Sequence, residues 1–154
     1  KNLIGAFHTP RLVFRDIKLL CSLDPAVFWD GFGEVIKYAM LSKPVYDLVA
    51  GKADTGLDLE AVISECARFE YELISEDFED RGLRKTLNFG HTLGHAIEKA
   101  SRYEVSHGMA VVMGMALMFR ISAGEGWCDE SIEEAFLALI DEYDYDASID
   151  CGVD

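Results

Sequence analysis

Apolar side chains recur every three or four residues over most of this chain, which is the spacing of helices that bury one face. The pattern predicts a short helix within residues 42–58 and five longer helices. The acidic stretch 75–82 and residues 101–106 lack this spacing and are predicted loops, and no firm pattern remains beyond residue 141. The five longer predicted helices cover residues 25–40, 59–74, 87–100, 107–123 and 130–141.

The amino-terminal part has a different pattern. Residues 3–7 and 11–14 are short and apolar, and the turn-forming residues 8–10 separate them. Two such runs around a turn predict a pair of β-strands. The first helix is expected to begin at Pro25, with Asp24 as its cap. The predicted fold is therefore mainly α: a helical bundle domain with a short β-hairpin at the start.

Length and charge narrow the class of protein. The chain has 154 residues, 50% of them hydrophobic, which suits one domain with a substantial core. Its formal net charge of −14, from 28 acidic and 14 basic residues, disfavours binding to nucleic acid or to anionic membranes. The longest apolar run, residues 109–119, is too short to cross a bilayer. We therefore expect neither a nucleic-acid partner nor a membrane.

The cysteines and the start of the chain indicate a cytoplasmic origin. The four cysteines are widely spaced and form no C-x-x-C pair, as expected for reduced thiols in the cytoplasm. The chain shows no secretory signal, and it begins with Lys1 rather than Met. We expect a fragment or processed piece of a longer protein.

The histidines carry the strongest chemical signal. His91 and His95 are four residues apart, so on a helix they share one face and can converge on one point. His107 opens the next predicted helix, and Glu34 could add a carboxylate. Three such ligands with one open position are typical of a catalytic zinc site, although cobalt fits as well. The spacing alone leaves open which histidines bind metal and which are merely hydrogen-bonded.

Several residues near these histidines could bind an anionic substrate. Lys37 follows Glu34 by three residues, so it either pairs with that carboxylate or faces a substrate. Arg84 could grip a phosphate or carboxylate, or it could only neutralise the acidic loop before it. Asn88 could orient a substrate hydroxyl or cap a helix. Gly90 and Gly94 lower helix propensity, which suggests close approach to another element or to a ligand.

Four blocks of this sequence together resemble one known family, 3-dehydroquinate synthase. They are residues 1–7, 33–38, 82–98 and 107–108, in the order found in that family. The resemblance runs from residue 1 to about residue 126, and the long histidine block is its most specific part. It implies a two-domain enzyme with an amino-terminal, NAD-binding α/β domain and a carboxy-terminal helical domain.

The resemblance also implies where this chain lies within the enzyme. Residues 1–24 would be a short β segment joining the NAD-binding domain, which is missing here. Residues 25–154 would be the helical metal- and substrate-binding domain, truncated at both ends. Because the fragment cannot hold NAD⁺ by itself, it is expected to be inactive alone. The full-length enzyme is expected to be a homodimer in which Arg84 could reach a neighbouring site.

Residue roles carry over from the family position by position. The metal ligands implied are Glu34, His91 and His107, which corrects the simpler expectation that both helical histidines bind metal. His95 becomes a residue for substrate binding or proton transfer. Catalytic roles are implied for His95, Lys37 and Asn88. The substrate-binding positions implied are Arg84, Lys37, Asn88, His95, Lys1 and Asn2.

The implied reaction converts 3-deoxy-D-arabino-heptulosonate 7-phosphate to 3-dehydroquinate in the shikimate pathway. A ring hydroxyl is oxidised transiently with NAD⁺, phosphate is eliminated, and the carbonyl is reduced again before the ring opens and closes by an aldol step. The cofactors implied are NAD⁺ and a divalent metal, Zn²⁺ or Co²⁺. The partner implied is a small anionic sugar phosphate.

Two residues depart from the family pattern. Glu70 stands where a lysine is usual, and Met109 stands where an acidic residue is common. A carboxylate at position 70 should weaken binding of a dianionic substrate unless Arg68 or another base compensates. The alternatives are therefore another sugar-phosphate cyclase, such as a 2-deoxy-scyllo-inosose synthase-like enzyme, or a metal-dependent polyol dehydrogenase. A helical binding module without catalysis would need no converging ligands.

Overall fold

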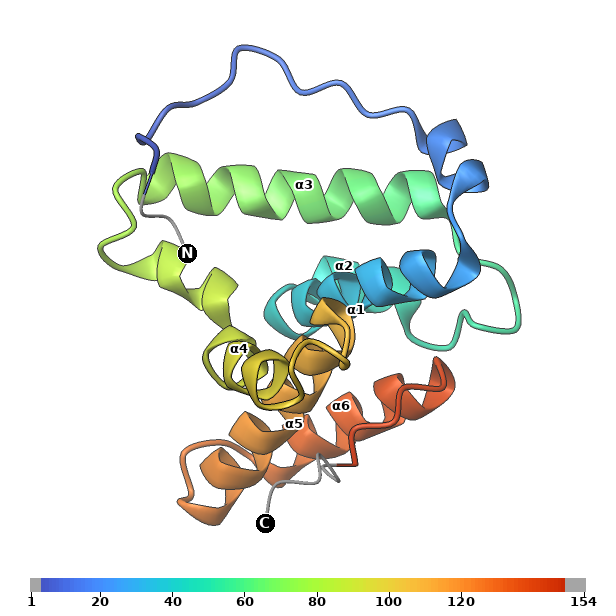
Figure 1. Ribbon diagram of the computed structural model, residues 1–154, viewed down its shortest axis with the longest axis vertical. Coiled ribbons are helices and arrows are strands. Elements are labelled where there is room, and N and C mark those ends of the chain that lie inside the picture. Colours follow the sequence, from blue (N-terminus) through green and yellow to red (C-terminus); the bar gives the residue numbers. More distant parts are fainter. Residues whose placement is uncertain (1–3, 149–154) are drawn as a thin grey trace.

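The computed structural model describes residues 4–148, and helices make up most of this range (Figure 1). Six α-helices and two short 3-10 helices occur within it. In chain order they are η1 (Ile17–Ser22), α1 (Pro25–Leu41), α2 (Lys43–Val49), α3 (Leu59–Glu76), η2 (Leu83–Asn88), α4 (His91–Ala100), α5 (His107–Gly124) and α6 (Glu130–Glu142). The predicted mainly helical fold is confirmed.

Aspartates start three of the longer helices. Asp24 accepts a hydrogen bond from the backbone N–H of Ala26, and Pro25 occupies the first turn of α1. Asp58 and Asp129 cap α3 and α6 in the same way. Such caps satisfy backbone N–H groups that have no partner inside the helix. Local sequence therefore sets where α1 begins, at Pro25 behind Asp24, as predicted. This helix carries the first site residues.

α5 lies at the centre of the core. It packs against α1, α4 and α6, while α2 joins α1 to α3. Figure 1 shows the result: α3 lies towards one end of the molecule below the extended amino-terminal segment, α1 and α2 come next, and α5 and α6 lie towards the other end. The fully buried large side chains come from α1, α2, α3, α5 and α6: Ile36, Val45, Val49, Val62, Val111, Val112, Met115, Phe136 and Leu139.

Small residues let the site helices approach closely. A Cβ atom on Gly33 of α1 would lie 2.6 Å from the carbonyl oxygen of Gly108 on α5, and one on Gly108 would lie 1.7 Å from the carbonyl oxygen of Asp30. Between α4 and α5, a Cβ atom on Gly94 would lie 2.9 Å from the carbonyl oxygen of Ala110. The expected close approach of the glycine-bearing helices is confirmed, and it fixes the spacing of α1, α4 and α5.

α5 also suits a membrane span by length and composition. The apolar run 109–119 is shorter than the helix, which extends from His107 to Gly124. Its apolar character has a structural cause here. Eight of its residues are buried, and three helices pack around it.

The prediction of a β-hairpin at the start is wrong for the described residues. Within residues 4–148 no strand forms, and residues 4–16 run extended beside α3. Ile4, Leu12 and Phe14 have largely exposed side chains. Strands require hydrogen-bonded neighbours, and a two-stranded ribbon alone is marginal. Leu3 lies outside the described residues.

The helix predicted for residues 87–100 begins later than expected. Gly90 has φ +75°, a left-handed conformation that ends the preceding turn, and α4 starts at His91. Asn88 consequently closes the 3-10 helix η2 rather than lying on α4. The acidic loop is shorter than predicted, since α3 continues to Glu76.

Candidate metal centre

Three helices bring one carboxylate and two imidazoles together. Glu34 comes from the middle of α1, His91 is the first residue of α4, and His107 is the first residue of α5. Oε1 of Glu34 lies 3.1 Å from Nε2 of His91 and 3.2 Å from Nε2 of His107. One ligand atom from each of the three residues lies within 4.8 Å of the others. This donor set and spacing fit a divalent transition metal such as zinc or cobalt.

The far nitrogen of each imidazole has its own hydrogen-bond partner. Nδ1 of His91 lies 3.1 Å from the carbonyl oxygen of Phe89, and Nδ1 of His107 lies 3.2 Å from Oε1 of Glu98. With a metal bound, a proton on Nδ1 would donate to these acceptors and leave the Nε2 lone pair for the metal, whereas a proton on Nε2 of His91 donates to Glu34 instead. Both rings are thus turned so that Nε2 is the atom offered to a metal.

A buried lysine keeps the carboxylate charged. Burial alone would raise the pKa of Glu34, but hydrogen bonds from His91 and Lys37, with the charge of Lys37, lower it to about 2. Nζ of Lys37 lies 2.6 Å from Oε2 of Glu34, and its side chain is only 5% exposed. Glu34 is therefore an anion at neutral pH, and its other oxygen remains directed at the histidines.

His95 lies beside this group. Its ring centroid is 5.5 Å from that of His91 and 5.8 Å from that of His107, and its side chain is 37% exposed. Nε2 of His95 lies 3.9 Å from Oε2 of Glu98. His95, Glu98 and His107 form a second group whose ligand atoms lie within 4.8 Å of one another. His95 therefore adjoins the centre beside His91, His107 and Glu98.

The remaining predicted substrate residues lie in other surroundings. Arg84 donates to the carbonyl oxygen of Phe78 and, together with Glu70, borders a cavity of about 620 Å³ between residues 6–15 and α3. Asn88 borders a different hollow of about 540 Å³. The residues that the structure brings together are Glu34, Lys37, His91, His95 and His107. Lys1 and Asn2 lie outside the described residues.

Two supporting residues escaped the sequence reasoning. Asp30 accepts hydrogen bonds from the backbone N–H groups of Gly108 and Met109, at 2.7 and 3.3 Å, and so ties α1 to the start of α5. Glu98 contacts His107 from α4. Asp30 precedes Glu34 by one helical turn, and Glu98 follows His95 by three residues. Helical spacing from known site residues is the signal that could have found them.

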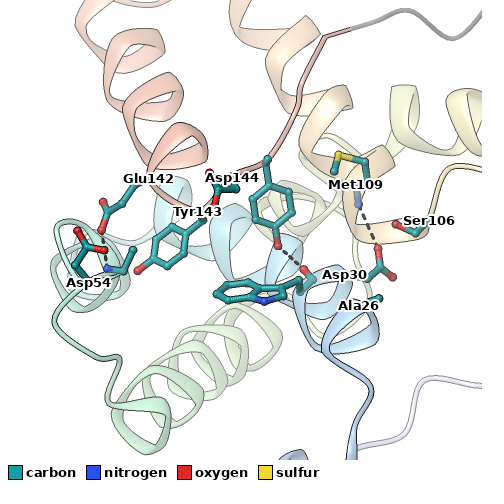
Figure 2. A pocket seen from close by; sticks show the side chains of 11 residues that line it. Ala26, Asp30, Asp54, Ser106, Met109, Glu142, Tyr143 and Asp144 are labelled. Atoms are coloured by element: carbon teal, nitrogen blue, oxygen red, sulfur yellow. Dashed lines mark hydrogen bonds between the residues drawn. The ribbon is translucent and has the colours of Figure 1, made fainter.

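A cavity of about 560 Å³ lies on the side of α1 near α6. Several of its polar groups are engaged within the fold. The hydroxyl of Tyr145 donates to the backbone carbonyl of Trp29, and Asp30 accepts from the backbone N–H of Met109 (Figure 2). Glu142 accepts from the backbone of Gly51 and Ala53. These contacts join α6 to the loop after α2 and join the residues after α6 to α1, so the cavity marks a junction between elements.

Comparison with known proteins places these residues in a family. Residues 31–154 match the family model described as 3-dehydroquinate synthase C-terminal. The chain belongs to this family. The match covers most of α1 and all of α2 to α6, and so includes the metal centre with Lys37, His95 and Glu98. The family resemblance stated from the sequence is confirmed.

Relatives from bacteria and archaea carry the name 3-dehydroquinate synthase. The one from Clostridium perfringens strain SM101 is 40% identical over 148 residues, which covers 93% of this chain and 42% of that protein. Those from Thermococcus kodakarensis and Sulfolobus acidocaldarius are 42% and 36% identical, over 79% and 97% of this chain and 35% and 44% of the relatives. The chain spans less than half the length of these family members.

Proposed function

We propose that residues 25–154 are the metal- and substrate-binding part of a 3-dehydroquinate synthase. The enzyme would cyclise 3-deoxy-D-arabino-heptulosonate 7-phosphate to 3-dehydroquinate with loss of phosphate, within the shikimate pathway. The observation that carries the proposal is the meeting of Glu34, His91 and His107 from three helices around one point. Membership of the family supports the same conclusion.

Glu34, His91 and His107 would hold the divalent cation, Zn²⁺ or Co²⁺. When bound, such an ion acts as a Lewis acid toward the substrate hydroxyl that is oxidised. Lys37 supports this arrangement, because its ammonium holds one oxygen of Glu34 and leaves the other for the cation. The partial exposure of His107 leaves one side of the centre accessible to a substrate.

His95 is proposed as the residue that moves a proton. Its imidazole stands next to His107 and is partly open to solvent, so it can exchange a proton between substrate and water. Lys37 and Asn88 complete the proposed catalytic set. Arg84, Lys1 and Asn2 are proposed to bind the phosphate and carboxylate of the substrate together with these residues.

The rest of the chemistry requires more than this chain. Hydride transfer belongs to NAD⁺, which we assign to the part of the enzyme that precedes the matched region in the relatives. We therefore propose that the isolated chain is inactive. The complete enzyme is proposed to be a cytoplasmic homodimer that binds neither nucleic acid nor membrane.

Phosphate release tests this proposal. The natural protein, including any sequence that flanks residues 1–154, is given 3-deoxy-D-arabino-heptulosonate 7-phosphate, NAD⁺ and Zn²⁺. We expect phosphate release that stops with a chelator and in Glu34→Ala and His107→Ala, whereas Glu104→Gln, at an exposed loop position, retains it. Failure to release phosphate, from protein that binds both metal and NAD⁺, would contradict the proposed substrate.

Glu70 favours a second candidate, another sugar-phosphate cyclase. Glu70 borders the same cavity as Arg84. Burial raises the pKa of Tyr38, and the charges of Glu70 and Glu34 raise it further, which places the Glu70 carboxylate close to the α1 site helix. An anion there suits a substrate with less negative charge. Under this candidate Glu70→Lys would gain phosphate release from 3-deoxy-D-arabino-heptulosonate 7-phosphate that the wild type lacks.

A further inference from the structure

Glu98 joins two histidines of the site through one carboxylate. It lies on α4, and its side chain is 16% exposed. Its Oε1 lies 3.2 Å from Nδ1 of His107, and its Oε2 lies 3.9 Å from Nε2 of His95. The close packing of Gly94 on the backbone of Ala110 sets the α4–α5 distance that this contact requires.

We propose that Glu98 is the positioning residue of the metal centre. Carboxylates face both ring nitrogens of His107, and each can only accept a hydrogen bond. Once Nε2 is given to a metal shared with Glu34, the ring proton stays on Nδ1, where Glu98 accepts it. The lone pair is then on Nε2, the atom that faces Glu34. The inference rests on the proposed metal-dependent function, and it assigns to Glu98 the orientation of one ligand rather than contact with the metal.

The two proposed histidine ligands differ in the group that accepts from Nδ1 and so orients the ring. His91 is oriented by the neutral carbonyl oxygen of Phe89, whereas His107 is oriented by a charged carboxylate. A charged acceptor makes a stronger hydrogen bond than a neutral carbonyl oxygen. Both histidines are the first residue of their helix, so neither ring is held by a preceding turn of that helix. Glu98 therefore supplies the restraint that the helix itself does not provide.

Cobalt binding tests the proposal directly. The natural protein, with any flanking sequence, is titrated with Co²⁺ as wild type, Glu98→Gln, Glu98→Ala and the control Glu104→Gln, which removes the same charge at an exposed position. Loss of such a partner typically weakens metal binding by about 10- to 100-fold. We expect that loss in Glu98→Ala, a smaller one in Glu98→Gln, whose amide oxygen still accepts a hydrogen bond, and wild-type affinity in Glu104→Gln.

The visible spectrum of the bound cobalt separates positioning from general stability. We expect saturated Glu98→Ala to show a shifted cobalt spectrum, because His107 is no longer held in one orientation. Unfolding of the metal-free variants measures the structural effect independently. If Glu98→Ala fails to fold, Glu98→Gln alone carries the test, since it keeps the size of the side chain.

Three outcomes overturn the inference. Unchanged affinity and spectrum in both Glu98 variants would show that Glu98 does not orient the ligand. Two bound cobalt ions in the wild type, one of them lost in the Glu98 variants, would make His95, Glu98 and His107 a second metal site. A wild type that binds no cobalt would refute the metal-dependent function itself, a result distinct from failure of the Glu98 variants.

Discussion

At the scale of single residues, the site is organised around the charge of one carboxylate. Glu34 is held by Lys37 on one oxygen and faces two imidazoles with the other. Lys37 is the one charged residue that is buried within residues 4–148. A buried ammonium is costly unless it remains paired, so these two residues support each other apart from any role in metal binding.

Removing one member of this pair should therefore destabilise the folded protein more than removing both. In metal-free protein, we expect Glu34→Gln to lower the free energy of unfolding by about 2 kcal/mol, less than for a fully buried pair because Glu34 is partly exposed. The double variant Glu34→Gln with Lys37→Met should recover much of that loss. Urea unfolding of the wild type, the single variants and the double variant measures the coupling; strictly additive losses would contradict it.

Cys66 gives a second prediction at this scale. Burial, with the negative charge of Glu65, raises the pKa of its thiol above the ordinary value to about 11. Unfolded protein loses this proton at about 8.5. The contribution of Cys66 to stability is thus fully present below about 8.5 and is lost as pH rises through about 11.

Thiol labelling measures how much less reactive Cys66 is than an exposed cysteine. At pH 8 we expect exposed Cys21 to react much faster than Cys66 with a thiol-specific reagent, as followed by peptide mass spectrometry. Cys66→Ser should reduce the loss of stability between pH 9 and pH 11 (a range of about two units), whereas Cys21→Ser should leave it unchanged. Equal labelling of both cysteines would contradict the burial of Cys66.

At the scale of elements, the site depends on how closely α1, α4 and α5 pack. Gly33 and Gly108 lie backbone to backbone where α1 crosses α5, one residue from the ligands Glu34 and His107. The distance between two ligands is therefore set by residues that carry no chemistry. Asp30 adds to this contact by accepting hydrogen bonds from the start of α5.

Gly108→Ala should separate α1 from α5. Its Cβ would lie 1.7 Å from the carbonyl oxygen of Asp30, a backbone atom that cannot move aside alone. We expect a loss of about 1–3 kcal/mol in stability together with weaker metal binding. Gly124→Ala is the matched control, because nothing lies within 4 Å of its Cβ at the end of the same helix, and it should be neutral or slightly stabilising. Similar behaviour of the two variants would refute the packing argument.

At the scale of the whole molecule, the metal centre joins parts that are far apart in sequence. The ligands come from α1, α4 and α5, which include the central core helix. An ion bound by all three residues would favour only the folded chain, in which they meet. Metal binding and global stability are therefore expected to be linked.

Zinc should raise the thermal unfolding midpoint. At an ion concentration about 100-fold above Kd, the folded state gains about 2.7 kcal/mol. We expect the midpoint to rise by several degrees with Zn²⁺ in the wild type and not in His91→Ala, as measured by circular dichroism. Mg²⁺ should have little effect, because it prefers oxygen ligands. An equal rise in His91→Ala would place the zinc elsewhere.

Local signals in the sequence determined most of the helices and the composition of the site. Apolar spacing and capping aspartates act within one helix, so they could be read without knowledge of the fold. The family blocks selected Glu34, His91 and His107 as ligands, and these residues do meet. The roles of Lys37, Arg84, Asn88 and His95 toward a substrate stay predictions.

Only the tertiary structure decided what depends on neighbours from distant parts of the chain. The apolar runs near the start predicted strands, but strands need partners, and residues 4–16 have none within the described range. Gly90 ended a predicted helix early, because its backbone is left-handed and lies against Val111 and Met115 of α5, where a larger residue would not fit. The contact of Glu98 with His107 likewise exists only because α4 and α5 lie side by side. Sequence supplied the chemical groups, and packing fixed the directions in which they point.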